Sequence, residues 1–180
     1  MTAPYKNRGL VLPFEDKVPR LADGIFIAAG AEVIGDVEIG PGSSVWYNCV
    51  LRGDVNVIRV GSGSNIQDGT VIHVSRRTHG TFIGNDVTIG HMALIHGCTL
   101  EDRCFVGMRA TVMDGCVVEP DAMLAAGALL TPGKRVPTGQ LWAGSPAVFK
   151  REITADEAAY FAETAHHYAE LAQRHMKSRG

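Results

Sequence analysis

The sequence predicts an all-β solenoid, namely a parallel β-helix of hexapeptide repeats, with an α-helix packed along it at the C-terminal end. The main observation is that large apolar residues recur every six positions with few breaks. Small residues such as Cys104, Ala110 and Cys116 stand four places after one of these anchors. A second observation is the set of 21 glycines, which are spread through the chain and supply turn conformations.

The six-residue period fits short strands joined by tight turns. An amphipathic helix would repeat about every 3.6 residues and a half-buried strand about every two, so neither explains the period. Three short strands make one triangular coil of about 18 residues, and stacked coils form parallel ladders about 4.8 Å apart. The anchors predict roughly six coils. They are Ile27, Val33, Ile39, Val45, Leu51, Val60, Ile66, Ile72, Ile83, Ile89, Ile95, Leu100, Val106, Val112, Val118, Leu124, Leu130, Val136 and Trp142.

The predicted elements follow one another along a single domain, residues 1–180. We expect residues 1–20 to be a lead-in that covers the first coil and residues 21–148 to form the β-helix. The C-terminal helix is predicted over residues 153–177, because Thr154 and Glu157 have the spacing of a capping box. Apolar and small residues then recur at helical spacing, at Phe161, Ala165, Tyr168 and Ala172.

Composition excludes several classes of protein. The net charge of −2 removes the bulk electrostatic attraction that favours nucleic-acid binding. No apolar run approaches the ~18 residues of a membrane span, and the N-terminus shows no apolar region of a signal peptide. The four cysteines form no CxxC pair, so a thiolate zinc site is not expected. We therefore expect a cytoplasmic protein with reduced thiols that binds no nucleic acid and does not insert into a membrane.

The period breaks at three steps, and breaks in a solenoid are where sites tend to lie. The step from Leu51 to Val60 is nine residues, that from Ile72 to Ile83 is eleven, and that from Ile95 to Leu100 is five. If each step is one enlarged or shortened strand-and-turn unit, Leu51, Ile72 and Ile95 share one column of the prism, and Ile66 and Ile89 share another. Should the eleven-residue step contain two short units instead, the columns would shift.

This alignment predicts a metal site. Arg52, His73 and His96 each follow their anchor directly, so they point outward on one column, with the two histidines about 5 Å apart on adjacent coils. Two imidazoles at that spacing can share one metal ion. His91 belongs to a different column, with Gln67 expected one coil below it, and could close the site on a neighbouring chain. The alternative is that the histidines are ordinary surface residues. The pattern favours a trimer with metal sites between subunits.

The residues around these breaks resemble a known family. The run Leu51-Arg52-Gly53-Asp54, the segment Asn65-Ile66-Gln67-Asp68-Gly69, and the histidines in Val71-Ile72-His73, Ile89-Gly90-His91 and Ile95-His96-Gly97-Cys98 are similar to those of the γ-class carbonic anhydrases. The resemblance covers nearly the whole chain. It implies a left-handed β-helix and a homotrimer. It also implies the reversible hydration of CO2 to bicarbonate by a metal-bound hydroxide.

The resemblance also implies roles for particular residues. The metal, zinc or else iron or cobalt, would be bound by His73, His91 and His96. Arg52 and Asp54 would form an ion pair between subunits, with Asp68 in the same network. Gln67 would be the polar residue beside the metal-bound water. Tyr168 would be the helix tyrosine near the site.

The loop after His73 departs from the fully described enzymes of that family. Those enzymes carry glutamates that shuttle protons, whereas residues 74–80 here read Val-Ser-Arg-Arg-Thr-His-Gly and hold no carboxylate. We therefore expect low activity. Two alternatives stay open: a non-catalytic trimeric scaffold that binds metal, and an acyltransferase that uses an acyl-thioester donor, since such enzymes share the hexapeptide repeat.

Overall fold

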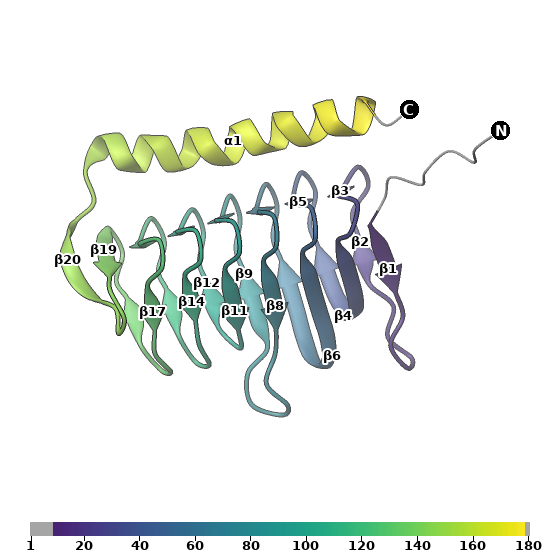
Figure 1. Ribbon diagram of the computed structural model, residues 1–180, viewed down its shortest axis with the longest axis horizontal. Helices are drawn as coiled ribbons and strands as arrows, with labels where there is room; N and C mark the ends of the chain where they lie inside the picture. The colour runs from purple at the N-terminus through teal and green to yellow at the C-terminus, as the bar shows by residue number, and fades with distance from the viewer. Residues whose placement is uncertain (1–8, 179–180) are drawn as a thin grey trace.

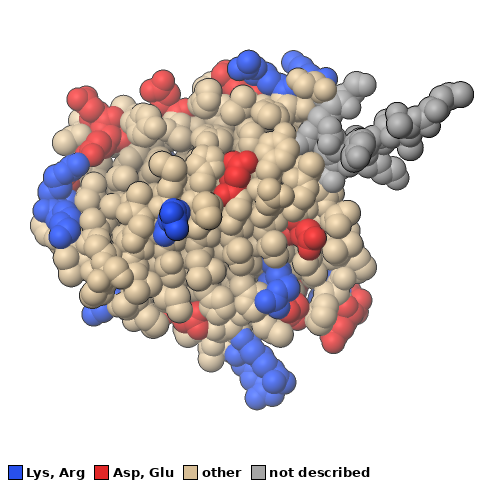
Figure 2. Space-filling view, viewed as in Figure 1, with Lys and Arg blue, Asp and Glu red and all other residues tan. Residues whose placement is uncertain are grey.

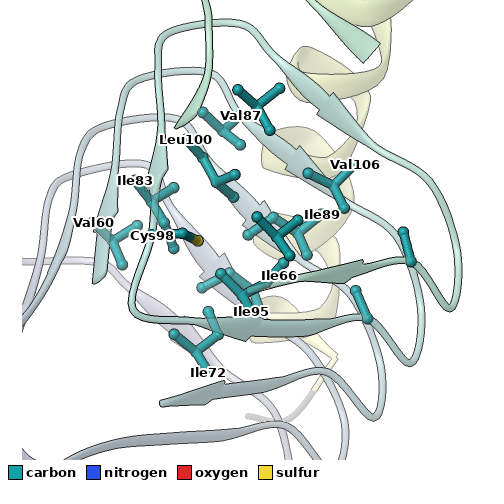
Figure 3. Close-up of a cluster of buried hydrophobic side chains, with 14 of the residues drawn as sticks. Val60, Ile66, Ile72, Ile83, Val87, Ile89, Ile95, Cys98, Leu100 and Val106 are labelled. Carbon is teal, nitrogen blue, oxygen red and sulfur yellow. The ribbon is translucent and has the colours of Figure 1, made fainter. Parts of the chain in front are cut away.

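The computed structural model describes residues 9–178 and confirms the predicted fold class. The chain winds into a left-handed parallel β-helix with three faces, and a single long helix lies along it (Figure 1). The anchors point into the prism. Ile66, Ile72, Ile89 and Ile95 have no exposed surface, and Figure 3 shows their side chains stacked between successive coils.

The first face, called here the helix face, holds one short parallel strand from each of seven coils. These strands are β3 (Phe26–Ile27), β5 (Ser44–Val45), β7 (Asn65–Ile66), β10 (Thr88–Ile89), β13 (Phe105–Val106), β16 (Met123–Leu124) and β19 (Gln140–Ala143). The antiparallel strand β20 (Val148–Glu152) pairs with β19 and ends the sheet. The anchors predicted roughly six coils, and the seventh strand of this face comes from Trp142, the last anchor.

The other two faces form one continuous sheet, because two long strands run across the corner between them. These are β4 (Glu32–Ile39) and β6 (Val50–Val60). The histidine face consists of their first halves with β1 (Leu10–Leu12), β8 (Val71–His73), β11 (Leu94–His96), β14 (Thr111–Val112) and β17 (Leu129–Leu130). The third face consists of their second halves with β2 (Arg20–Leu21), β9 (Thr81–Ile83), β12 (Thr99–Leu100), β15 (Val117–Val118) and β18 (Arg135–Val136).

The register of the sheet confirms the column alignment drawn from the breaks. Leu51 pairs with Ile72, and Ile72 pairs with Ile95. On the helix face, Ile66 pairs with Ile89. The eleven-residue step therefore contains a single strand and a loop, which hangs below β8 and β9 in Figure 1.

The long helix α1 (Ala155–Lys177) contacts β3, β5, β7 and β10, so it covers the helix face. Thr154 and Glu157 form the predicted capping box. Toward its start, Phe161 packs against Phe105 with ring centroids 4.9 Å apart. Near its end, His175 Nδ1 lies 2.9 Å from the hydroxyl of Tyr47. Among the described residues, no helix is long and apolar enough to cross a membrane.

All four cysteines are buried free thiols. They occupy small inward positions, as the repeat predicted for Cys49, Cys104 and Cys116. Burial raises the pKa of the Cys49 thiol to about 12. The pKa of Cys98 is also raised by burial. These thiols are packing residues, since a buried thiol with a high pKa is a poor nucleophile.

Candidate metal centre

His73 and His96 lie side by side at the ends of β8 and β11. Each follows an inward anchor, so its side chain alternates to the outer surface of the histidine face. Nδ1 of His73 and Nε2 of His96 face each other at 3.1 Å, and the ring centroids are 5.1 Å apart. The outward pairing that the sequence predicted is therefore present.

The second nitrogen of His73 is held by a carboxylate. Nε2 lies 2.9 Å from Oδ1 of Asp54, whose other oxygen accepts a hydrogen bond from Arg52. Partial burial raises the pKa of Asp54, but the hydrogen bonds from His73 and Arg52 outweigh it, so the pKa lies below its ordinary value. Arg52 and Asp54 thus pair within one chain, whereas the family resemblance implied an ion pair between subunits, and Asp54 orients His73.

The second nitrogen of His96 is held by Asp114, a residue that the sequence analysis missed. Nδ1 of His96 lies 2.5 Å from Oδ1 of Asp114, and Oδ2 of Asp114 accepts a hydrogen bond from Ser75. Partial burial raises the pKa of Asp114, yet the bonds from Ser75 and His96 lower it overall. The repeat gave no direct signal for this contact, because Ile95 pairs with Val112 and the same register places Asp114 over Gly97 rather than over His96.

His91 lies at a different corner of the prism, just after β10. Its Nδ1 is 2.9 Å from Oδ2 of Asp68, one coil below. The sequence analysis expected Gln67 in that place, and this was wrong. The pairing of Ile66 with Ile89 makes the step between these coils 23 residues, and 23 residues before His91 is Asp68.

Gln67 and Tyr168 lie on the same side as His91. Gln67 is buried, and its Nε2 donates to Oδ1 of Asn65 at 3.0 Å. Tyr168 packs edge-on against Trp46, with ring centroids 5.2 Å apart. Burial raises the pKa of Tyr168, and the negative charge of Asp68 adds to the rise.

The predicted site residues therefore form two half-sites on one chain. The two-histidine half-site contains Arg52, Asp54, His73 and His96, together with Asp114. The one-histidine half-site contains Gln67, Asp68, His91 and Tyr168. Within residues 9–178, no three His, Cys, Asp or Glu side chains are grouped so that they could hold a metal ion. One chain by itself thus brings together two of the three predicted ligands.

The donor atoms fit a metal ion. Two nitrogens bound to one tetrahedral zinc ion lie about 3.3 Å apart, and the two facing nitrogens here are 3.1 Å apart. Histidines that bind metals usually give their other ring N–H to a carboxylate or carbonyl group. All three predicted ligands do so, to Asp54, Asp114 and Asp68. This arrangement leaves one nitrogen of each ring available for a metal.

A buried hydroxyl ties the two histidine-bearing coils together behind the side chains. Oγ1 of Thr81 donates to the carbonyl oxygen of His73 at 2.6 Å and accepts from the amide of Gly97 at 3.0 Å. The loop of residues 74–80 closes with a hydrogen bond from the amide of Ser75 to the carbonyl oxygen of His79 at 2.8 Å. Arg76 and Arg77 in this loop are exposed.

Comparison with known proteins found close relatives. Gamma carbonic anhydrase 1, mitochondrial, of Arabidopsis thaliana is 52% identical over 175 residues, which cover 94% of this chain and 63% of the relative. The probable carbonic anhydrase of Methanocaldococcus jannaschii is 44% identical over 153 residues, which cover 85% of this chain and 96% of the relative. The chain therefore spans about 63% of the length of the Arabidopsis protein. No protein-family model matches.

A solved structure shares both the fold and much of the sequence. The hexapeptide transferase family protein from Anaplasma phagocytophilum superposes with a TM-score of 0.87 at 48% identity, covering 91% of this chain and 96% of that one. The fold is thus shared with a protein named for the hexapeptide transferase family, whereas the relatives matched by sequence are named as carbonic anhydrases.

Proposed function

Since this chain belongs to the γ-class carbonic anhydrase family, we propose that it catalyses the reversible hydration of CO2 to bicarbonate. The observation that carries the proposal is the pair of facing nitrogens on His73 and His96, 3.1 Å apart, each on a ring whose other nitrogen is held by a carboxylate. A pair of imidazoles fixed in this way is an incomplete set of metal ligands.

We propose that His73 and His96 of one chain and His91 of a neighbouring chain bind the metal, which we propose to be zinc, with iron or cobalt as the alternatives. A metal in this position would supply the Lewis-acid activation of water that CO2 hydration needs at neutral pH. The separation of the two half-sites supports ligands from two chains. A cyclic trimer would then contain three equivalent sites, since each interface joins the same two surfaces.

The surface near the two half-sites suits an interface. Met92 and Met108 are 61% and 55% exposed, and Val71 and Leu94 are also exposed on the histidine face. Figure 2 shows that charged side chains are scattered over the side that it draws and that most of that surface is uncharged. Met92 and Arg109 also have φ angles of 60° and 58°, in the region that favours glycine. The coils on either side have glycine at the same corner, Gly69 and Gly127. Long side chains at that corner therefore carry a conformational cost that contacts with another chain would offset.

The other site residues have supporting roles in this proposal. Arg52 and Asp54 orient His73, and Arg52 is exposed enough to reach a neighbouring chain. Asp68 orients His91. Gln67 would donate a hydrogen bond to bicarbonate or to the reacting water. Tyr168 would border the space where CO2 enters.

Stopped-flow CO2 hydration on zinc-loaded and cobalt-loaded protein, with His96→Ala beside it, tests the activity. We expect hydration above the rate of buffer that disappears in the variant. Full metal occupancy without CO2 hydration would contradict the proposed carbonic anhydrase activity and would favour the non-catalytic scaffold. That outcome has a physical basis, because residues 74–80 hold no carboxylate to move protons. We expect slow turnover for the same reason.

The name of the Anaplasma structure keeps an acyltransferase as the second candidate. An assay for the release of thiol from an acyl-thioester donor, in the presence of amine acceptors, tests this activity. The three histidines proposed as metal ligands argue against an acyltransferase. We propose the cytoplasm as the compartment; the Arabidopsis relatives are named as mitochondrial proteins.

A further inference from the structure

We propose that Ser75 and Asp114 act together as positioning residues for His96, so that the loop of residues 74–80 controls how firmly that ligand is held. This inference rests on the proposed function, because it concerns a ligand of the proposed metal. Neither residue belongs to the set that the family resemblance supplied. Their contacts arise only in the folded chain.

The first step is the contact between Asp114 and His96. Asp114 follows Met113 on the coil above, and its Oδ1 lies 2.5 Å from Nδ1 of His96. A carboxylate in this place holds the proton of the imidazole on Nδ1 and therefore leaves Nε2 free to bind a metal. The same contact fixes the rotation of the ring, so Nε2 stays aimed at the facing nitrogen of His73.

The second step is the space that permits the contact. Gly97 follows His96 and has a φ of 55°. A Cβ at this residue would lie 2.7 Å from Oδ1 of Asp114 and 3.0 Å from Cβ of His79. Glycine is therefore required at this corner so that the carboxylate can approach from the next coil.

The third step is the fixation of Asp114 by the loop. Ser75 donates its hydroxyl hydrogen to Oδ2 of Asp114. The backbone of Ser75 is itself held on both sides, because its amide donates to the carbonyl oxygen of His79 at 2.8 Å and its carbonyl oxygen accepts from Nδ2 of Asn56 at 3.1 Å. Because the backbone of Ser75 is held in place, its hydroxyl orients the carboxylate of Asp114 more tightly than a serine on a mobile loop would. The loop is thereby connected to His96 through two hydrogen bonds, from Ser75 to Asp114 and from His96 to Asp114.

The test uses the full-length protein in two forms. In the metal-free form, NMR should show a ring N–H proton of His96 that exchanges slowly with water, assigned by its loss in His96→Ala. We expect Asp114→Ala to abolish this signal and Ser75→Ala to speed its exchange. In the second form, titration with Co2+ followed by visible absorption should show affinity about 10–100-fold lower for Asp114→Ala. The double variant should be no weaker than Asp114→Ala alone, because Ser75 acts through Asp114.

The matched control is Asp102→Ala. Asp102 also accepts a hydrogen bond across a coil boundary, from the amide of Asn85 at 2.8 Å, but touches no histidine. It should leave both readouts as in the unaltered protein. Equal Co2+ affinity in Asp114→Ala and Asp102→Ala, or a persistent His96 signal in Asp114→Ala, overturns the proposal. Additive losses from Ser75→Ala and Asp114→Ala overturn the coupling. Failure of the unaltered protein to bind Co2+ would refute the metal centre, and the metal-free NMR signal would still decide whether Asp114 holds the ring.

Discussion

The hydroxyl of Thr81 donates to the carbonyl oxygen of His73 at 2.6 Å, from a position with no exposed surface. The hydroxyl oxygen of Thr81 in turn accepts from the amide of Gly97, so Thr81 joins the coil of His73 to the coil of His96. The two neighbouring coils place an apolar side chain and a thiol in this inward column, Ile58 below and Cys98 above. The polar exception thus occurs where the two proposed ligands must keep a fixed separation.

Thr81→Val should therefore weaken both folding and metal binding. Valine has the same shape but no hydroxyl, so the free energy of unfolding should fall by about 1–2 kcal/mol and Co2+ affinity should fall with it. Thr81→Ser should restore both. Urea denaturation and Co2+ titration measure the two effects.

Ser64→Ala is the control for Thr81. Ser64 makes the same kind of bridge, donating to the carbonyl oxygen of Gly84 at 2.8 Å and accepting from the amide of Val87 at 2.9 Å. It should lose similar stability without losing Co2+ affinity. If Thr81→Val retains full affinity, its hydroxyl serves folding alone.

Ligands contributed by two chains make complementation possible between inactive variants. His73→Ala and His91→Ala trimers should each bind little metal. When the two are unfolded together and reassembled, each mixed trimer should regain one intact site, for about a quarter of the native metal content at equal proportions. Metal analysis of the purified trimers measures this. Metal content that stays at the level of the separate variants would contradict ligands shared between chains.

Replacing Met92 should separate folding from association. Met92→Gly removes the cost of a left-handed conformation and so stabilises the folded chain by about 1–2 kcal/mol. The added backbone entropy of glycine stabilises the unfolded chain by about 0.5–1 kcal/mol. We expect equal or slightly higher stability of the single chain and weaker association, measured by urea denaturation and sedimentation. Asp86→Gly, which has a φ of 54° at another corner, should leave association unchanged. Unaltered association in Met92→Gly would remove this corner from the interface.

Acid should weaken the start of α1 through Glu157. Its pKa is lowered to about 2, first by the hydrogen bonds from Arg151 and then by the amide of Thr154. A carboxyl whose pKa is lower in the folded state stabilises the fold above its ordinary pKa of 4.5 and loses that contribution as pH falls toward 2. Unfolding curves of Glu157→Gln should therefore diverge from those of the unaltered protein at neutral pH and converge in acid. A constant difference across this pH range would contradict the assignment.

The pairing of His73 with His96 could be predicted from the sequence because it depends only on counting residues between inward anchors. The same counting, with Ile66 paired with Ile89, gives Asp68 under His91; the expectation of Gln67 departed from that alignment by one residue. Asp114 could not be identified as a partner of His96 from the repeat alone. Its role depends on the missing side chain of Gly97 and on the path of the loop that brings Ser75 back to it.

The long helix has a consequence for how the molecule unfolds. In a stack of coils each unit contacts only its neighbours, so a solenoid can fray from either end one coil at a time. Here α1 contacts β10 in the middle of the stack and reaches β3 and β5 in its first coils. It also joins Tyr47 to His175, which are 128 residues apart in the chain. Loss of the first coils therefore requires release of the helix, and release of the helix exposes Phe26 and Trp46 beneath it. The helix therefore couples the N-terminal coils to the C-terminal end of the chain and makes their unfolding cooperative.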